Sequence, residues 1–337
     1  MKSSVKKFIL AVALSFFFFA ICLVSAPFIG SSDISFSDVF QWPINFYGSS
    51  AASIFWLTRM PRTLLAALAG AALSAAGVTF QALLRNPLAT PYTLGVSSGA
   101  SFGAVLALVL GIDRSILGIP GIQLLGFVTA IGTILLVYRL AEQNGTAPTH
   151  ILLLAGVTIS FFFAALILFL QYVADFTQTY RIVHWLMGSL DIAEYDPILT
   201  VTAFVIPSLM IMFGLAKDFN LFSAGDESAH ARGVAVEKSR KLAYLSASLA
   251  TAAVVSITGP IGFVGLIIPH TMRLIVGADH RILMPVSIFS GAGFLIICDT
   301  ISRTLFIASG GIPIGVLTAL IGGPFFLVLL FRLKIKS

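Results

Sequence analysis

Ten long apolar stretches follow one another along this chain of 337 residues. A helix needs roughly 20 apolar residues to cross a bilayer, and each stretch comes close to that length or exceeds it. The predicted spans are residues 8–29, 61–84, 93–111, 118–140, 149–173, 196–216, 240–258, 263–277, 282–302 and 313–331. The sequence therefore predicts an all-α polytopic membrane protein of about ten transmembrane helices, with residues 1–337 forming a single transmembrane domain.

Composition excludes the soluble alternatives. The chain is 58% hydrophobic and 10% charged, whereas a soluble domain usually carries about 25% charged residues. Such a chain lacks the polar surface of a cytosolic, secreted or DNA-binding protein, so no nucleic-acid partner is expected. The first apolar run is longer than the 7–15 residues of a signal-peptide core, and we interpret it as the first membrane helix.

The distribution of positive charge predicts the orientation. Cytoplasmic loops of membrane proteins carry an excess of Lys and Arg. With the N-terminus inside, fifteen of the twenty Lys and Arg residues fall in inner segments, and five remain outside. The outer five are Arg59, Arg62, Arg114, Arg181 and Arg303. Ten spans then place both termini, and the loop at 217–241, in the cytoplasm.

Catalytic and metal-binding motifs are missing from the sequence. No lysine follows a glycine, so the chain has no P-loop and is not expected to hydrolyse ATP itself. The five histidines stand apart from one another, which predicts no metal site; for His270, in the eighth span, we expect an interhelical hydrogen bond. Few ionisable residues lie away from the span ends, which argues against a self-powered secondary transporter. A partner protein is expected to supply the energy.

Three polar segments interrupt the apolar pattern. Arg59 and Arg62 share one helix face at the outer end of the second span, where Pro61 is typical of a helix start. The loop at 217–241 predicts a short helix, with Asp226 and Glu227 at its positive end and Gly233 after it. Between residues 259 and 326, Gly and Pro repeatedly break the apolar helices, which is tolerated only where protein or a water-filled cavity satisfies the freed backbone.

Six motifs in order resemble one family. They are RMPR at 59–62, QALLRNPLATPYTLGVSSGA at 81–100, WLMGSL at 185–190, GPIGFVGLIIPH at 259–270, GADHR at 277–281 and PIGVLTALIGGPFF at 313–326. Together they resemble the FecCD/BtuC permeases, the membrane subunits of bacterial ABC importers for iron–siderophore complexes, haem and cobalamin. The resemblance covers about residues 55–331 and implies the type II ABC importer permease fold.

The resemblance also implies partners and site residues. A second permease chain, two ATPase subunits that bind ATP and Mg, and an external substrate-binding protein are expected around this chain. Binding-protein docking is implied for Arg59, Arg62 and Arg303. The segment that contacts the ATPase would include Gly225, Asp226, Glu227, Ala229, Arg232 and Gly233. Family-motif residues expected near the pathway are Gln81, Asn86, Pro87, Gly95, Gly99, Pro313 and Gly315.

Two positions depart from the family pattern. Arg232 stands where Leu is common, which leaves the detail of the ATPase contact open, and Gly311 stands where Glu is common, which affects the outer mouth of the pathway. We interpret the chain as a permease subunit in the bacterial cytoplasmic membrane that carries a ferric siderophore or similar metal chelate, with cobalamin or haem as alternatives. A membrane-integral lipid-modifying enzyme is the alternative from another class, and it would need intramembrane catalytic groups that the sequence lacks.

Overall fold

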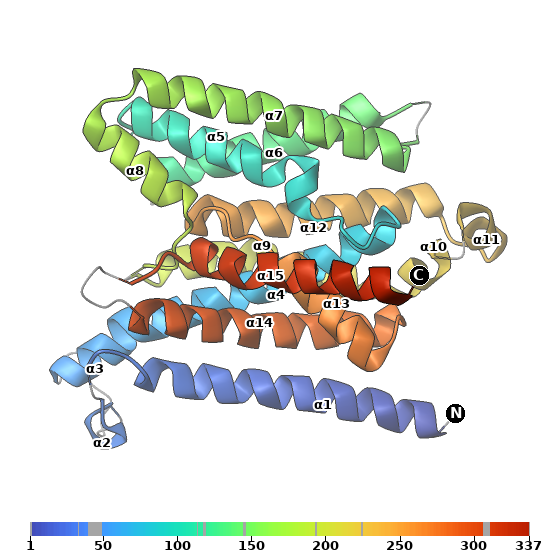
Figure 1. The fold of residues 1–337 in the computed structure, drawn as a ribbon, viewed down its shortest axis with the longest axis horizontal. Helices are drawn as coiled ribbons and strands as arrows, with labels where there is room; N and C mark the ends of the chain where they lie inside the picture. The colour runs from blue at the N-terminus through green and yellow to red at the C-terminus, as the bar shows by residue number, and fades with distance from the viewer. Residues whose placement is uncertain are drawn as a thin grey trace.

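The computed structural model is a bundle of helices that run roughly parallel and antiparallel to one another (Figure 1). It describes residues 2–32, 34–39, 49–112, 114–116, 119–143, 146–192, 194–223, 225–305 and 311–336. The α-helices are α1 (Lys2–Ser25), α2 (Phe36–Val39), α3 (Ser50–Ile54), α4 (Met60–Leu83), α5 (Val96–Val109), α6 (Gly121–Ala141), α7 (Thr149–Val173), α8 (Phe176–Leu186), α9 (Asp196–Gly214), α10 (Ala216–Phe222), α11 (Asp226–Ala231), α12 (Val236–Thr258), α13 (Val264–Val276), α14 (His280–Thr304) and α15 (Ile314–Lys336). Short 3₁₀ helices η1 (Ala26–Phe28) and η3 (Pro91–Leu94), a π-helical turn η2 (Phe55–Arg59) and the paired strands β1 (Ser115–Ile116) and β2 (Ile119–Pro120) complete the elements.

The predicted spans coincide with observed helices. Among the described residues, seven helical segments are long and apolar enough to cross a membrane, and three shorter apolar helices accompany them. The shorter three are α5, α13 and the apolar part of α15. The breaks expected at Gly259 and Gly277 are confirmed, because these residues cap the C-terminal ends of α12 and α13 with positive φ angles.

The second span differs from its predicted form. Pro61 lies in the first turn of α4, as predicted, but α3, the π-helical turn η2 and α4 together form one continuous helical segment from Ser50 to Leu83. Proline has no N–H to donate to the preceding turn, and a π-helical turn is one of the ways in which a helix accommodates a local break in its hydrogen-bond pattern. This end of the span is therefore helical for about three turns more than the sequence suggested.

Helix α4 lies at the centre of the bundle, where it packs against α9, α12, α13 and α14. Its many alanine and glycine residues let neighbouring backbones approach closely, as small residues do at contacts between membrane helices. A Cβ atom added at Gly70 would lie 2.2 Å from the carbonyl oxygen of Gly291 in α14. One added at Gly77 would lie 2.0 Å from the carbonyl oxygen of Gly265 in α13. Only glycine fits at these two crossings.

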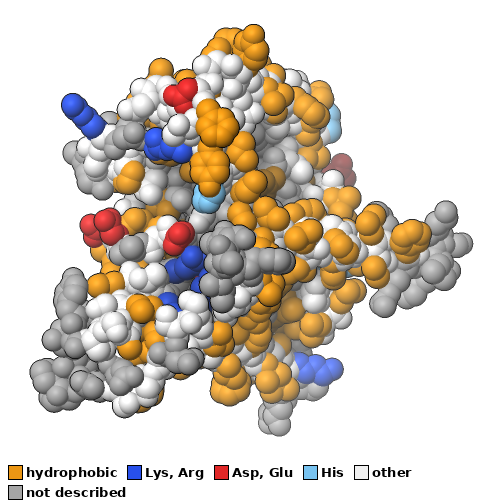
Figure 2. Space-filling model, turned by 60° about the vertical axis from the view of Figure 1, so that its left-hand side comes forward, with side chains coloured by type: hydrophobic (Ala, Val, Ile, Leu, Met, Phe, Trp, Pro, Cys, Tyr) orange, Lys and Arg blue, Asp and Glu red, His pale blue; other side chains and the backbone are white. Residues whose placement is uncertain are grey.

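Different short helices lie at the two ends of the bundle. Both termini lie at the same end as α10 and α11, and α2, α3 and α8 lie at the opposite end (Figure 1). In the view that brings this opposite end forward, hydrophobic side chains occupy much of the described surface and only a few charged side chains lie between them (Figure 2).

Candidate functional site

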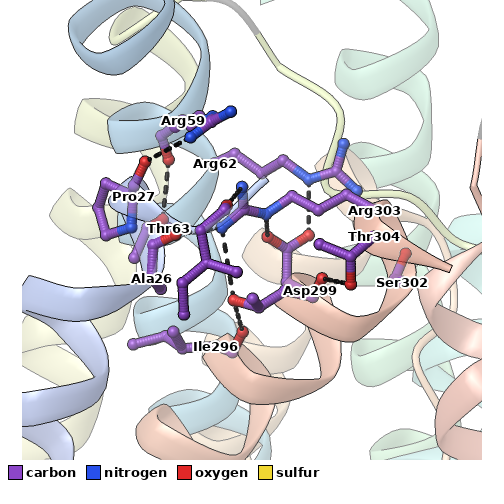
Figure 3. Close-up of polar contacts among 12 residues, drawn as sticks. Ala26, Pro27, Arg59, Arg62, Thr63, Ile296, Asp299, Ser302, Arg303 and Thr304 are labelled. Atoms are coloured by element: carbon purple, nitrogen blue, oxygen red, sulfur yellow. Dashed lines mark hydrogen bonds and ion pairs between the residues drawn. The ribbon is translucent and has the colours of Figure 1, made fainter. Parts of the chain in front are cut away.

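The three arginines expected to dock a binding protein lie together at the end of the bundle opposite the termini. Two of them, Arg62 and Arg303, hold the carboxylate of Asp299 in α14, whose side chain is 2% exposed (Figure 3). Arg62 Nε donates to Asp299 Oδ1 at 2.6 Å. Arg303 Nε lies 3.5 Å from Asp299 Oδ2, within ion-pairing distance. A buried charge requires such partners, because its desolvation is otherwise uncompensated.

Two of these arginines also bind the backbone that follows α1. Arg59 Nη1 donates to the carbonyl oxygens of Pro27 at 3.1 Å and Phe28 at 3.2 Å, and its Nη2 donates to that of Ser32 at 2.8 Å. Arg303 donates to the carbonyl oxygens of Ala26 and Ile29. The guanidinium groups therefore bind backbone carbonyls in and just after η1. They fasten the end of α1 to the neighbouring ends of α4 and α14.

Asp299 is a site residue that the sequence analysis missed. Its signal was present, since Asp299 and Arg303 are four residues apart and so share a face of one helix. The pairing of Asp299 with Arg62, 237 positions away, depends on tertiary packing. Arg62 additionally pairs with Asp191 at 3.3 Å, and the side chain of Asp191 is 75% exposed.

The three arginines differ in how much of each is exposed to solvent. The side chain of Arg62 is 17% exposed and that of Arg303 is 11% exposed, while Arg59 as a whole residue is 6% exposed. Docking through Arg59 or Arg303 would require them to leave backbone carbonyls. The docking role stays a prediction for all three, and the geometry favours Arg62.

The two carboxylates bound to Arg62 give a matched pair of variants. Asp299→Asn leaves two arginines without their buried counter-charge, and breaking a buried pair costs about 3–5 kcal/mol. Asp191→Asn removes an exposed pair with the same arginine and should cost less than about 1 kcal/mol. Cys22 and Cys298 are both buried free thiols, so thermal unfolding followed with a thiol-reactive fluorophore measures the difference. Equal melting temperatures for the two variants would refute the structural role of Asp299.

At the other end of the bundle, α10 is braced against three membrane helices. Arg85, just after α4, donates from Nε to the carbonyl oxygen of Phe222 at 2.9 Å. Ser239 in α12 donates to Asp218 Oδ2 at 2.6 Å. Asn220 donates to Asp279 Oδ1 at 2.7 Å, at the start of α14. Displacement of α10 would therefore be transmitted directly to α4, α12 and α14.

Asp279 holds the α14 end of this bracing. Its carboxylate caps α14 by accepting from the backbone N–H of Arg281 at 3.0 Å. Hydrogen bonds from the Arg281 side chain, and then from Asn220, hold the pKa of Asp279 well below its usual range. The carboxylate is thus charged at neutral pH, and its contribution to stability is present there. That contribution is lost only as pH falls below the ordinary carboxyl range toward the lowered pKa.

The short helix expected in the 217–241 loop is present as α11. Gly225 precedes it with φ +106°, and Gly233 follows it with φ +81°, backbone conformations that favour glycine. Ala229 is fully buried and fastens the helix to its surroundings, whereas Glu227 and Arg232 are exposed. The helix begins at Asp226, as predicted, and ends at Ala231, with Arg232 as its C-cap. Helix α10, which the sequence analysis did not predict, makes up the other half of this unit.

Four family-motif residues lie near the α10 end of α4 or in the turn that leads into α5. Gln81 is buried, where its Oε1 accepts from Arg273 Nη2 at 2.7 Å. Asn86 Oδ1 accepts from the backbone N–H of Leu88 at 2.9 Å, which forms a tight turn around the exposed Pro87. Gly95 has φ +82° and separates η3 from α5. These residues shape the turn between α4 and α5.

The remaining motif residues are packing positions. A Cβ atom at Gly99 would lie 2.1 Å from Thr133 Oγ1, so α5 and α6 are in close contact there. One at Gly315 would lie 2.4 Å from the carbonyl oxygen of Met187. Pro313 precedes α15 and accepts from two of its first backbone N–H groups. Gly311 has φ +88°, which accounts for glycine at a position where the family commonly has Glu. Their proximity to a pathway stays a prediction.

Among the described residues, the expected interhelical hydrogen bond of His270 is not present, although His270 does contact another helix. Its Nε2 is buried and has no hydrogen-bond partner, and the ring packs 6.2 Å from Phe325 and 6.4 Å from Phe326 of α15, measured between ring centroids. The interhelical contact is therefore aromatic packing. Within the described part of the chain, no group of three or more His, Cys, Asp or Glu side chains is arranged to hold a metal ion.

The fold is that of a multi-pass membrane protein with a short helical pair, α10 and α11, at one end. Comparison with known proteins specifies its class. A solved structure described as an inward-facing conformation of an ABC transporter, assigned to the metal-chelate type, matches with a TM-score of 0.82 and 33% identity, over 96% of this chain and 99% of that one. The family model of the FecCD transport family matches residues 16–332. The chain belongs to the FecCD transport family.

Two curated relatives carry different cargoes. The cobalamin import system permease protein BtuC of Halobacterium salinarum is 40% identical over 288 residues, which are 86% of this chain and 76% of the relative. The hemin transport system permease protein HmuU of Yersinia pestis is 37% identical over 279 residues, 82% and 83% of the two chains. This chain is accordingly the permease subunit of an ABC importer and not an enzyme, which excludes the lipid-modifying alternative.

Proposed function

We propose that this permease moves a ferric siderophore or similar metal chelate inward across the bacterial cytoplasmic membrane, driven by ATP hydrolysed in a partner subunit. The observation that carries the coupling part of the proposal is the α10–α11 unit. It lies at the end that holds both termini and is bonded to α4, α12 and α14. A partner that moved α11 would move these helix ends with it.

The proposed assembly contains a second permease chain, identical or related, two ATPase subunits and an external binding protein. ATP and Mg would be bound by the ATPase subunits, since this chain has no P-loop. The charge distribution supports a cytoplasmic position for both termini and for α10–α11, because fifteen of the twenty Lys and Arg residues lie on that side of the predicted spans.

The coupling proposal predicts the effect of changing the exposed face of α11. Glu227→Lys combined with Arg232→Glu reverses two exposed charges without altering the buried Ala229, so the chain should insert and fold normally. We expect loss of uptake and at least tenfold weaker capture of the ATPase, which corresponds to about 1.4 kcal/mol. Pull-down of the ATPase by the tagged permease measures this.

Two variants control the coupling experiment. Arg139→Glu alters an exposed charge in α6, outside the α10–α11 unit, and should bind the ATPase normally. Arg232→Leu restores the residue common in the family and should also be tolerated. Undiminished capture by the charge-reversal variant would remove α11 from the ATPase interface.

Docking of the binding protein should depend on Arg62. Arg62→Gln also breaks the buried pair with Asp299, so its docking is compared with that of Asp299→Asn, which breaks the same pair and keeps the Arg62 charge. One ion pair at a surface contributes only about 0.2–1 kcal/mol, so Arg62→Gln should weaken association mildly relative to Asp299→Asn, mainly through the association rate. Added salt should weaken docking of the unaltered permease, since screening shortens the reach of surface charges. Association with permease in nanodiscs, measured at low and high salt, tests both effects, and Arg114→Gln is the control for a distant outer arginine. An association rate that changed neither with salt nor with Arg62→Gln would contradict the docking role.

The cargo proposal is tested by transport. Ferric siderophore is the first candidate, supported by the metal-chelate type of the structural relative, and cobalamin and haem are the alternatives supported by the two curated relatives. Proteoliposomes that contain the permease, its ATPase and its cognate binding protein should accumulate ferric siderophore in an ATP-dependent manner. Accumulation of cobalamin or haem alone would reassign the cargo and leave the coupling proposal intact.

A further inference from the structure

Helix α1 contacts the bundle unevenly along its length. Its outer half packs on α14, where the ring centroids of Phe16 and Phe289 lie 5.3 Å apart and Phe18 lies against Gly293. Beyond its outer end, Arg59 and Arg303 hold the following backbone. Toward the N-terminus, α1 faces α13 and α14 across a groove that residues of all three helices line.

The groove has a volume of about 880 Å³. One wall is a single face of α1, with Leu10, Leu14 and Phe18 at helical spacing, and the opposite walls include Met272 of α13 and Val286 of α14. The volume is in the range of sites that hold small molecules. Its walls are largely apolar, so it suits a hydrocarbon ligand.

The hydroxyl groups in the groove are already engaged. Ser15 Oγ donates to the carbonyl oxygen of Val12 within α1 at 2.9 Å. Ser290 Oγ donates to the sulfur of Met272 at 3.3 Å. The charged residue of the lining is Lys7, which is exposed at the N-terminal end of the groove. The groove thus has an apolar length and one cationic end.

The length of the groove matches one leaflet of a bilayer. Lys7 and Phe18 are eleven residues apart, which at 1.5 Å per residue is about 16 Å along the helix. Half of a hydrocarbon core of about 30 Å is about 15 Å. A lysine at such a helix end extends its ammonium group to the headgroup region. The cationic end therefore falls at the depth of lipid phosphates.

We propose that this groove binds an acyl chain of an anionic phospholipid, with the lipid phosphate against Lys7. Basic residues at a pocket between membrane helices suit anionic headgroups. The apolar walls and the lipid-facing side chains of α1, of whose most apolar 18 residues only 11% are buried, suit the acyl chain. A bound lipid would fill the space that α1 leaves and hold its inner half to α13 and α14. The orientation proposed above makes the leaflet the cytoplasmic one, but the site itself does not depend on it.

Native mass spectrometry of the full chain, released from nanodiscs of phosphatidylglycerol and phosphatidylethanolamine in equal amounts, tests the proposal. The unaltered chain should retain phosphatidylglycerol preferentially. Lys7→Gln should lower phosphatidylglycerol retention about fivefold, the factor for one basic residue at an anionic surface. Arg139→Gln, which removes an exposed charge at the end of α6, should not. Ala11→Trp fills the groove and should release lipid, whereas Ala13→Trp, on an exposed position of the same helix outside the lining, should not.

The outcomes separate the possible occupants. Equal retention of the two lipids, unchanged by Lys7→Gln, would overturn the proposal whether or not Ala11→Trp folds. If Ala11→Trp abolished the dimer while lipid retention stayed constant, the groove would be an interface with a second copy of the chain, and the lipid proposal would again be overturned. Uptake of the cargo enters none of these measurements, so failure of the lipid site and failure of the transport proposal remain distinguishable.

Discussion

The closest backbone contacts described in the bundle lie along α4, where Gly70 meets Gly291 and Gly77 meets Gly265. Within lipid, the hydrophobic effect does not drive helices to associate. Dispersion contacts between closely approaching backbones therefore have to stabilise the helix pairs. At each crossing a single added Cβ atom would collide with a carbonyl group. The positions of α13 and α14 follow from these contacts, and with them the positions of the polar groups at both ends.

Polar groups at both ends of the bundle need hydrogen-bond or charge partners, and the two ends provide these partners in different ways. At the end opposite the termini, Asp299 is almost fully buried and is paired with Arg62 and with Arg303, which also binds backbone carbonyls after α1. At the end that holds both termini, α10 is hydrogen-bonded to residues of α4's end, α12 and α14, and Asn220 bonds both Asp279 and the backbone N–H of His280. The cluster around Asp299 holds helix ends together, while α10 links α11 to the membrane helices. That difference suits a transporter whose energy enters from one side.

Arg62 is part of a buried pair and would also be the arginine for the proposed docking. Arg62 contacts both the buried Asp299 and the exposed Asp191. An acidic residue of a docking partner would therefore replace Asp191 more readily than Asp299, because an exposed pair is weakly held. Docking through Arg62 leaves the buried pairing intact, which is why the structure favours it over docking through Arg59.

Much of the architecture was predictable because membrane spans depend on local composition. Runs of apolar residues located every span, Gly259 and Gly277 marked the breaks between α12, α13 and α14, and the glycines at 225 and 233 bracketed α11. The start of the second span was not predictable in the same way. Pro61 is a good helix start by local rules, and the π-helical turn before it carries the helix back to Ser50.

Sequence by itself determined the membrane class, the spans, the family and the side on which the positive charges gather, since each of these depends on residue type and order along the chain. Only the tertiary structure decided the partners of those charges. Arg62 and Asp299 are 237 positions apart, and Arg303 reaches carbonyls near residue 26. The groove between α1, α13 and α14 likewise depends on three helices at once. Contacts between distant segments depend on how the helices pack, and the pattern of residues in any one helix does not specify that packing.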